Sequence, residues 1–309
     1  KQAKADNVEA QVYLGNIYEM GRIGTKDYRS AFYWYKQAAE KNYGEAQSNL
    51  ARMYLQGRGV TRNLQKAQYW FERSAERGDR TAQAFLSHFY SKGIVVKKDL
   101  KRAFVLMQKS AKQGFTPAES FLSTMYFHGQ GTRKNYDKSF YWAKKAAKHG
   151  GRAVQFLLGR HYEFGLGTPV DYKQAFFWYK KSADQGFVLG EANVAAAYAN
   201  GRGVKRDAKT AIVYFKKAAD QGNGDSQAMV GLYYLFGQHS LPKDYKLALY
   251  YTKLALKKNN PKAQFSMGFA YENGLGVKRD RKQAIYWYKK ASKNGVATAT
   301  NRLKVIQGR

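Results

Sequence analysis

Residues 263–295 read AQFSMGFAYENGLGVKRDRKQAIYWYKKASKNG, one complete unit of a pattern that fills the chain. In its first half, small or apolar residues stand at Ala263, Met267, Gly268 and Tyr271. This i, i+4, i+5, i+8 spacing places them on one face of a helix. The glycines at 274 and 276 supply the left-handed backbone that ends a helix at little cost, and a second apolar run follows. The unit therefore predicts a helix, a glycine turn and a second helix.

This unit recurs eight times along the chain. A tyrosine followed three residues later by a glycine marks each copy, and successive tyrosines are 36 residues apart except at the last step, which is 37. The tyrosines are Tyr18, Tyr54, Tyr90, Tyr126, Tyr162, Tyr198, Tyr234 and Tyr271. We predict one solenoid domain over residues 1–309: residues 1–9 end a preceding repeat, residues 10–298 hold eight repeats, and residues 299–309 begin a ninth, capping helix.

Residues at fixed places in each unit predict the ends of the second helices. An Asp or Asn is typical of an N-cap, because its side chain accepts hydrogen bonds from free backbone N–H groups. The predicted N-caps are Asp27, Asn63, Asp99, Asn135, Asp171, Asp207, Asp244 and Asp280. A Gly or Asn, the two residues that tolerate the C′ position, ends each second helix. These are Asn42, Gly78, Gly114, Gly150, Gly186, Gly222, Asn259 and Gly295.

One unit cannot bury its own apolar face, so neighbouring units must stack. Small residues such as Ala31, Ala38 and Gly15 let helices approach closely, and large aromatic residues fill the space between layers. The sequence thus predicts an all-α fold, a right-handed superhelical solenoid of about eight 36-residue helix–turn–helix repeats.

The composition limits the class of protein. With 44% hydrophobic and 16% aromatic residues, the chain has enough apolar material to fold around a core. No run of about 18 apolar residues occurs, so no transmembrane segment is predicted. The absence of cysteine excludes disulfides, thiol catalysis and thiolate metal sites. Lys and Arg number 54 against 22 Asp and Glu, and the net charge of +32 favours anionic partners.

No catalytic or metal-binding motif stands out. None of the histidines pairs with a second ligand at metal spacing on one helix, so we interpret all of them as ordinary surface or groove residues. They are His88, His128, His149, His161 and His239. The Gly-x-Gly segments follow helices and lack the Lys-Ser/Thr ending of phosphate loops, so we interpret them as turns. We predict a protein without enzymatic activity, cofactor or metal.

The pattern A-x3-L-G-x2-Y-x2-G-x-G-V-x2-D-x3-A-x2-W-Y-x-K-A-A-x2-G resembles the Sel-one-like repeat, a relative of the tetratricopeptide repeat, over residues 10–298. The resemblance implies a non-catalytic adaptor that binds other proteins or, in some cases, cell-wall material. We expect this chain to be a monomer. One role found in the family is that of a bacterial immunity or regulatory protein that occludes a secreted effector. Because the family is common among exported bacterial proteins, we expect a periplasmic location, with the signal peptide absent from this chain.

Several units depart from this pattern. Ile23 replaces the second turn glycine of unit one, and unit three has Ile94-Val95-Val96 in its turn and Leu106-Met107 in place of Trp-Tyr. Ala143 replaces the tyrosine of that pair in unit four. Unit seven contains a one-residue insertion within residues 237–242, where we expect a local distortion of the superhelix.

Basic residues form stripes along the repeats. Two adjacent columns just after the Trp-Tyr pair hold the residues that we call the basic stripe. Its members are Lys144, Lys145, Lys180, Lys181, Lys216 and Lys217. Lysines late in a helix complement the helix dipole and solvate an outer face, so these positions do not identify a partner by themselves.

The first helices predict a binding groove. Since Leu14, Gly15 and Tyr18 face neighbouring helices, the columns of residues 13, 16 and 20 face the other way, towards the concave side. These columns vary between units and include aromatic and Arg residues, as binding hot spots do. The predicted groove residues are Tyr13, Arg52, Phe85, His88, Phe121, His128, Arg160, Phe164 and Phe236. An alternative is that Phe85 and Phe121 simply pack between adjacent first helices.

The favoured hypothesis is an adaptor that binds an acidic protein partner in the concave groove. An alternative is electrostatic binding of an anionic envelope polymer or lipid surface, and another is nucleic-acid binding. The last is weaker, because no recognised nucleic-acid module is present and the basic columns fall mainly on turns and second helices.

Overall fold

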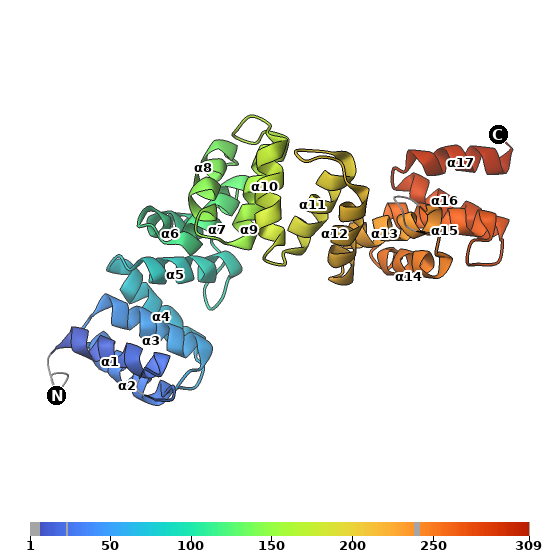
Figure 1. The fold of residues 1–309 in the computed structure, drawn as a ribbon. Helices are drawn as coiled ribbons and strands as arrows, with labels where there is room; N and C mark the ends of the chain where they lie inside the picture. The colour runs from blue at the N-terminus through green and yellow to red at the C-terminus, as the bar shows by residue number, and fades with distance from the viewer. Residues whose placement is uncertain (1–6, 23, 238–241, 309) are drawn as a thin grey trace. The chain divides into compact units, whose positions relative to one another are not determined.

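The computed structural model describes residues 7–22, 24–237 and 242–308, and within these it contains seventeen helices and no strand (Figure 1). The odd-numbered helices up to α15 are the first helices of the eight repeats, and the even-numbered ones are the second helices. They are α1 (Val8–Met20), α2 (Tyr28–Glu40), α3 (Gly44–Gln56), α4 (Leu64–Glu76), α5 (Arg80–Lys92), α6 (Leu100–Lys112), α7 (Thr116–His128), α8 (Tyr136–Ala147), α9 (Arg152–Phe164), α10 (Tyr172–Ala183), α11 (Val188–Asn200), α12 (Ala208–Asp220), α13 (Gly224–Phe236), α14 (Tyr245–Leu256), α15 (Pro261–Asn273), α16 (Arg281–Lys293) and α17 (Ala297–Gln307).

The all-α repeat architecture is therefore confirmed. Some predicted features lie outside the described residues: residues 1–6 of the predicted end of a preceding repeat (residues 1–9), the turn residue Ile23, His239, and most of the insertion in unit seven.

The predicted caps are confirmed in every repeat. Each of the eight Asp or Asn residues caps a second helix by accepting a backbone N–H in its first turn; at α10 the Gln174 amide donates to Asp171 Oδ1 over 3.0 Å. Asn42 and Asn259 follow α2 and α14 with φ of 65° and 54°, and glycines of positive φ follow the other six second helices. Local side-chain chemistry thus places the helix ends.

A backbone hydrogen bond closes the turn inside each repeat. The N–H of the capping Asp or Asn donates to the carbonyl of the repeated tyrosine over 2.9 or 3.0 Å in all eight repeats. In unit seven the same bond joins Asp244 to Tyr234 over 3.0 Å, although the loop between them is one residue longer. The hydrogen bond that closes the turn is therefore present in that repeat as in the others.

The second glycine of the turn lies against the preceding repeat. A Cβ added at Gly59, Gly131 or Gly203 would come within about 2.0 Å of a backbone carbonyl oxygen at the start of the second helix before it. In unit three, Val95 occupies this place with a φ of 64°, a left-handed conformation that a β-branched residue adopts at a cost. The turn backbone is thus kept even where the glycine is lost.

Small residues set the distance between the two helices of a repeat. Ala31 and Ala38 are fully buried, and a Cβ on Gly15 would lie 2.4 Å from the ring of Tyr35. Successive helices pack side by side from α1 to α8 and again from α10 to α17. The chain divides into two compact units, residues 1–154 with 166–168 and residues 155–165 with 169–309. Each unit has its own stacked layers and core.

Candidate protein-interaction surface

Exposed aromatic side chains lie on the first helices. Tyr13 on α1, Phe121 on α7 and Phe164 on α9 are 59%, 59% and 56% exposed, and His88 and His128 are exposed as well. These rings belong to columns that differ from repeat to repeat, so stacking of the layers does not require them. Large solvent-exposed rings are candidate anchors for binding, because a partner that buries them gains contact area and displaces water from an apolar surface.

The other predicted groove residues are partly drawn into the packing. Phe85 stacks on Phe71 of α4 with ring centroids 4.9 Å apart, and Phe236 packs against Phe269 at the same distance. Phe85 thus packs between the first helix α5 and the second helix α4, and not between adjacent first helices as the packing alternative had it. Phe121 is exposed.

The two groove arginines also have intramolecular contacts. Arg52 Nη2 lies 3.2 Å from Glu19 Oε2. The guanidinium carbon of Arg160 lies 5.9 Å from the centre of the Phe164 ring. Tyr13, Phe121 and Phe164 are therefore the predicted groove residues most clearly available to a partner.

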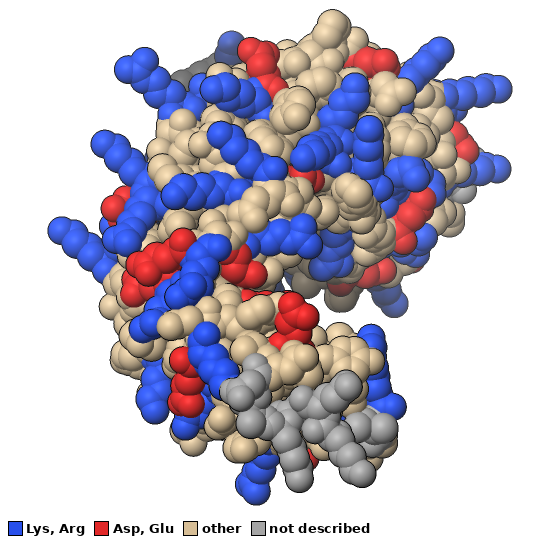
Figure 2. Space-filling view, turned by 90° about the vertical axis from the view of Figure 1, so that its left-hand side faces the viewer, with Lys and Arg blue, Asp and Glu red and all other residues tan. Residues whose placement is uncertain are grey.

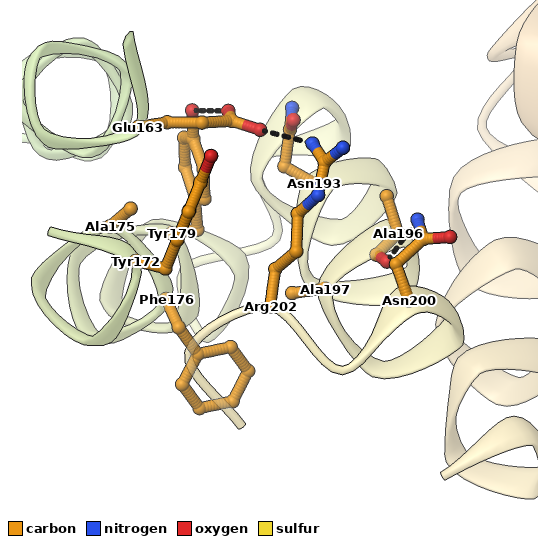
Figure 3. Close-up of a pocket in the computed structure, with 10 residues that line it drawn as sticks. All are labelled: Glu163, Tyr172, Ala175, Phe176, Tyr179, Asn193, Ala196, Ala197, Asn200 and Arg202. Carbon is orange, nitrogen blue, oxygen red and sulfur yellow. Dashed lines mark hydrogen bonds and ion pairs between the residues drawn. The ribbon is translucent and has the colours of Figure 1, made fainter. Parts of the chain in front are cut away.

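A buried tyrosine–glutamate hydrogen bond joins the two helices of three repeats, a contact missing from the sequence-based predictions. In Figure 3 the Tyr179 hydroxyl donates to Glu163 over 2.6 Å, and Arg202 of the next turn lies 3.6 Å from the other carboxylate oxygen. The equivalent Tyr–Glu distances are 2.8 Å for Tyr35 with Glu19 and 2.7 Å for Tyr288 with Glu272. Because the glutamate belongs to the first helix and the tyrosine to the second, the bond fixes their register.

A pattern in the sequence marks this pair. The tyrosine occurs only in units where a glutamate stands sixteen residues and a glycine twenty residues before it. A Cβ on the glycine would lie 2.6 Å from the ring of Tyr179 at Gly159, and 2.7 Å from that of Tyr288 at Gly268. In the other five units both members of the pair are replaced. The residues at the tyrosine position are Phe71, Met107, Ala143, Phe215 and Thr252, and those at the glutamate position are, in the same order, Leu55, Ser91, Phe127, Ala199 and Leu235. The joint change of these columns identifies the contact.

The charge state of these tyrosines follows from their surroundings. Burial raises the pKa of Tyr179 well above its ordinary range, and the hydrogen bond to Glu163 and its negative charge act in the same direction. Burial is also the main cause of the raised pKa of Tyr35 and Tyr288, where Glu19 and Glu272 add to it. All three phenols therefore remain neutral donors at physiological pH and serve as structural groups.

A small pocket lies beside the Glu163–Tyr179 pair. Residues of α9, α10 and α11 and the Arg202 turn line it (Figure 3). Its volume of about 30 Å³ holds one or two water molecules, whereas pockets for small ligands enclose roughly 300–1,000 Å³. This pocket does not support a small-molecule site.

Several members of the basic stripe have intramolecular partners. Lys145 Nζ lies 2.7 Å from Oε1 of the buried Glu119, and this hydrogen bond raises the pKa of Lys145. Lys180 pairs with Asp184, and Lys181 lies over the Phe177 ring at 5.2 Å. In Figure 2, Lys and Arg side chains project over one face and uncharged surface lies between them. The stripe therefore combines charge display with local packing.

Two further points concern chemistry and membranes. His88, His128 and His149 are exposed, but the prediction of a surface or groove position is wrong for His161, which is fully buried in α9 because that side of the helix packs inward. Among the described residues, no group of three or more His, Asp or Glu side chains is placed to hold a metal ion. None of the described helices has the length and apolar character needed to cross a membrane.

Stacked helix pairs with a repeated framework and variable exposed side chains define the class of helical-repeat proteins. The Sel1 repeat matches residues 8–43, 44–79, 81–115, 116–151, 153–187, 188–223, 224–260 and 261–296. The chain belongs to the Sel1 repeat family, as the Sel-one-like pattern predicted. Proteins of this family are typically scaffolds for protein interactions and are generally non-catalytic.

Two solved structures align along nearly the whole chain. A protective antigen present in uropathogenic Escherichia coli strains, which displays an SLR fold, is 32% identical with a TM-score of 0.81; the alignment covers 99% of this chain and 65% of that one. A Sel1 repeat protein from Oxalobacter formigenes is 26% identical with a TM-score of 0.65, over 99% of this chain and 88% of that one. This chain thus spans slightly less than two thirds of the antigen.

Two other likenesses are weaker. The chitin synthase regulator SKT5 of Saccharomyces cerevisiae is 44% identical over 48 residues, which cover 16% of this chain and 7% of that protein. An immunity protein from Pseudomonas aeruginosa is 20% identical with a TM-score of 0.44, over 69% of this chain and 80% of that one. Neither likeness is strong enough to transfer a partner.

Proposed function

We propose that this chain is a scaffold that binds an acidic protein partner through exposed side chains of its first helices. The observation that carries the proposal is the exposure of Tyr13, Phe121 and Phe164 at positions that differ between repeats. Framework positions recur in every repeat and therefore carry no information about one partner, whereas variable exposed rings can select it. The net charge of +32 favours a partner of negative charge and speeds its association.

A more specific form of the proposal is that of an immunity or regulatory protein whose partner is a secreted effector. It rests on roles known in the family and requires the same exposed side chains of the first helices for binding. The identity of the captured protein decides between this form and a general scaffold.

The test begins with capture of the partner from a nuclease-treated lysate at moderate salt. Binding is then measured for a groove variant, Tyr13→Ala with Phe121→Ala and Phe164→Ala. Truncating hot-spot rings costs about 2 kcal/mol or more each, mainly through faster dissociation. We expect the groove variant to lose at least a hundredfold in affinity, about 2.7 kcal/mol, while its thermal melting stays that of the parent.

A charge variant serves as the matched control. Lys144→Gln, Lys181→Gln and Lys216→Gln remove three charges of the basic stripe. Lys145 and Lys217 are left intact because each acts on a buried glutamate, Glu119 and Glu191. This variant should mainly associate more slowly. If it loses binding while the groove variant retains it, the chain is a polyanion binder instead. A loss of orders of magnitude between about 50 and 200 mM salt would point to nucleic acid.

A further inference from the structure

Every second helix carries a large apolar side chain at the same exposed position. We call these eight residues the ladder. They are Tyr33, Tyr69, Val105, Tyr141, Phe177, Val213, Tyr250 and Tyr286. Their exposed fractions run from 46% to 60%, so none of them belongs to the core. Apolar side chains scattered singly over a surface are ordinary, but here they stand at one position of every repeat and so form a regular row that a partner can contact.

The repeat framework does not account for the ladder. In α10 the buried face consists of Ala175, Tyr179, Ser182 and Ala183, and Phe177 lies on the side away from it. The neighbouring Trp178 meets the Phe177 ring edge-on at 5.1 Å, which orients the ring without covering it. The following tryptophan makes the same edge-on contact with Tyr33, Tyr69, Tyr141 and Tyr286, and Tyr251 makes it with Tyr250. The ladder is thus held in place at the outer side of the second helices.

Cations surround each rung of the ladder. On a helix, residues four before, three after and four after a given position are its surface neighbours. Eighteen of these twenty-four positions are Lys or Arg, and only Glu72 and Asp137 are acidic. Lys290 lies over the Tyr286 ring at 4.7 Å and Arg73 over that of Tyr69 at 5.6 Å. A partner of this face must therefore be anionic and must also accept apolar side chains.

The chemistry of the rungs distinguishes the possible partners. Single-stranded nucleic acid is bound by aromatic rings on which bases stack, but Val105 and Val213 offer no ring. In addition, a cation of the chain itself already covers one face of Tyr69, Phe177 and Tyr286. A valine can take the place of an aromatic residue without loss of binding if the partner requires only an apolar side chain at that position. The surface of an anionic bilayer meets that requirement, since aromatic and aliphatic side chains enter the headgroup region while lysines contact phosphates.

We propose that the ladder is a docking surface for an anionic lipid bilayer. The ladder side chains insert at the depth of the headgroups, and the flanking lysines and arginines bind the lipid phosphates. Each compact unit carries four rungs, so the surface exists on either unit by itself. The first-helix rings lie elsewhere on the repeats, and a membrane-bound scaffold keeps them available to a protein partner.

The test is co-sedimentation of the whole chain with vesicles at about 150 mM salt, where surface charges alone act over only about 8 Å. One set of vesicles is phosphatidylcholine, and the other contains phosphatidylglycerol at about a third of the lipid. The ladder variant is Tyr33→Ser with Phe177→Ser and Tyr250→Ser. The matched control, Tyr13→Ser with Phe121→Ser and Phe164→Ser, removes three rings of similar or greater exposure from the first helices.

We expect the parent and the control to bind the anionic vesicles equally and to leave the neutral ones unbound. The ladder variant, which keeps every lysine, should bind the anionic vesicles about tenfold or more weakly. Unchanged circular dichroism and melting verify its fold, and the single changes Tyr33→Ser and Phe177→Ser should give smaller losses in the same direction.

Three results would overturn the proposal: no binding of the parent to anionic vesicles, equal binding by the ladder variant, or ladder-dependent binding of poly-thymidine without vesicle binding. The protein-partner measurement uses the first-helix variant, so either proposal can fail while the other stands.

Discussion

At the scale of single residues, the turn of unit three shows how the repeat tolerates a substitution. The described second turn glycines, Gly59, Gly131, Gly167, Gly203 and Gly276, have φ between 68° and 71°. Val95 takes their place at 64° with its side chain 43% exposed. A β-branched residue in this region costs of order 1–3 kcal/mol, which packing of the surrounding helices must offset.

Val95→Gly should therefore stabilise the protein by about 1 kcal/mol, because relief of the strained φ exceeds the extra freedom that glycine gives to the unfolded chain. Urea unfolding measures the gain. Val96→Gly is the matched control: Val96 packs against the core at an ordinary φ, and its loss should destabilise. A Val95→Gly protein no more stable than the parent would show that the turn is not strained.

At the scale of the element, the pair of helices in one repeat is joined either by a Tyr–Glu hydrogen bond or by apolar contact. Unit five has Tyr179 with Glu163, whereas unit two has Phe71 and Leu55 at the same places. A buried hydroxyl without an acceptor costs about 1–3 kcal/mol, so changing one partner alone is unfavourable. This physical coupling explains why the two columns change together within the chain.

A double-mutant cycle on α9 and α10 tests this coupling. Glu163→Leu alone should destabilise by about 1–3 kcal/mol, because it leaves the Tyr179 hydroxyl unpaired. Adding Tyr179→Phe, which reproduces the pair of unit two, should recover part of that loss, with a coupling of about 1 kcal/mol or more in urea unfolding. Both variants that carry Glu163→Leu also lose the Glu163–Arg202 ion pair, so this loss cancels in the coupling energy. Additive effects of the two changes would show that the helices do not depend on this bond.

At the scale of the whole molecule, charge is the dominant feature. The net charge of +32 creates repulsion within the folded chain that nearby ion pairs relieve only locally. Ion pairs such as Lys145 with Glu119 and Arg302 with Glu272 each neutralise one cation at close range. The remaining repulsion acts over distances that salt screens.

Raising salt from about 10 to about 150 mM should therefore raise the Tm, since the Debye length falls from roughly 30 to 8 Å. The charge variant with Lys144→Gln, Lys181→Gln and Lys216→Gln should melt above the parent at low salt and approach it at high salt. Thermal melting by circular dichroism measures both. A Tm that falls with salt in the parent would mean that attraction between paired charges outweighs the repulsion.

The helices and their ends could be predicted from the sequence because they depend on residues close together in the chain. Asp171 caps α10 by accepting a hydrogen bond from the amide three residues later, and Gly186 adopts a positive φ just beyond the end of that helix. The repeat period and the stacked architecture follow from the same local pattern, so the Sel1 repeat fold could be predicted from the sequence. Residue identity alone determined these features.

Only the tertiary structure decided which side chains of each helix remain exposed to solvent. Phe85 and Phe121 occupy the same column, yet Phe85 stacks on Phe71 while Phe121 is exposed, because the neighbouring second helix supplies an aromatic ring in one layer and not in the other. Burial depends on what residues of adjacent layers place opposite a position, and those contacts join residues far apart in the chain. The physical reason is that helix formation depends on residues a few positions apart in the chain, whereas the burial of a helix surface depends also on the helices that pack against it.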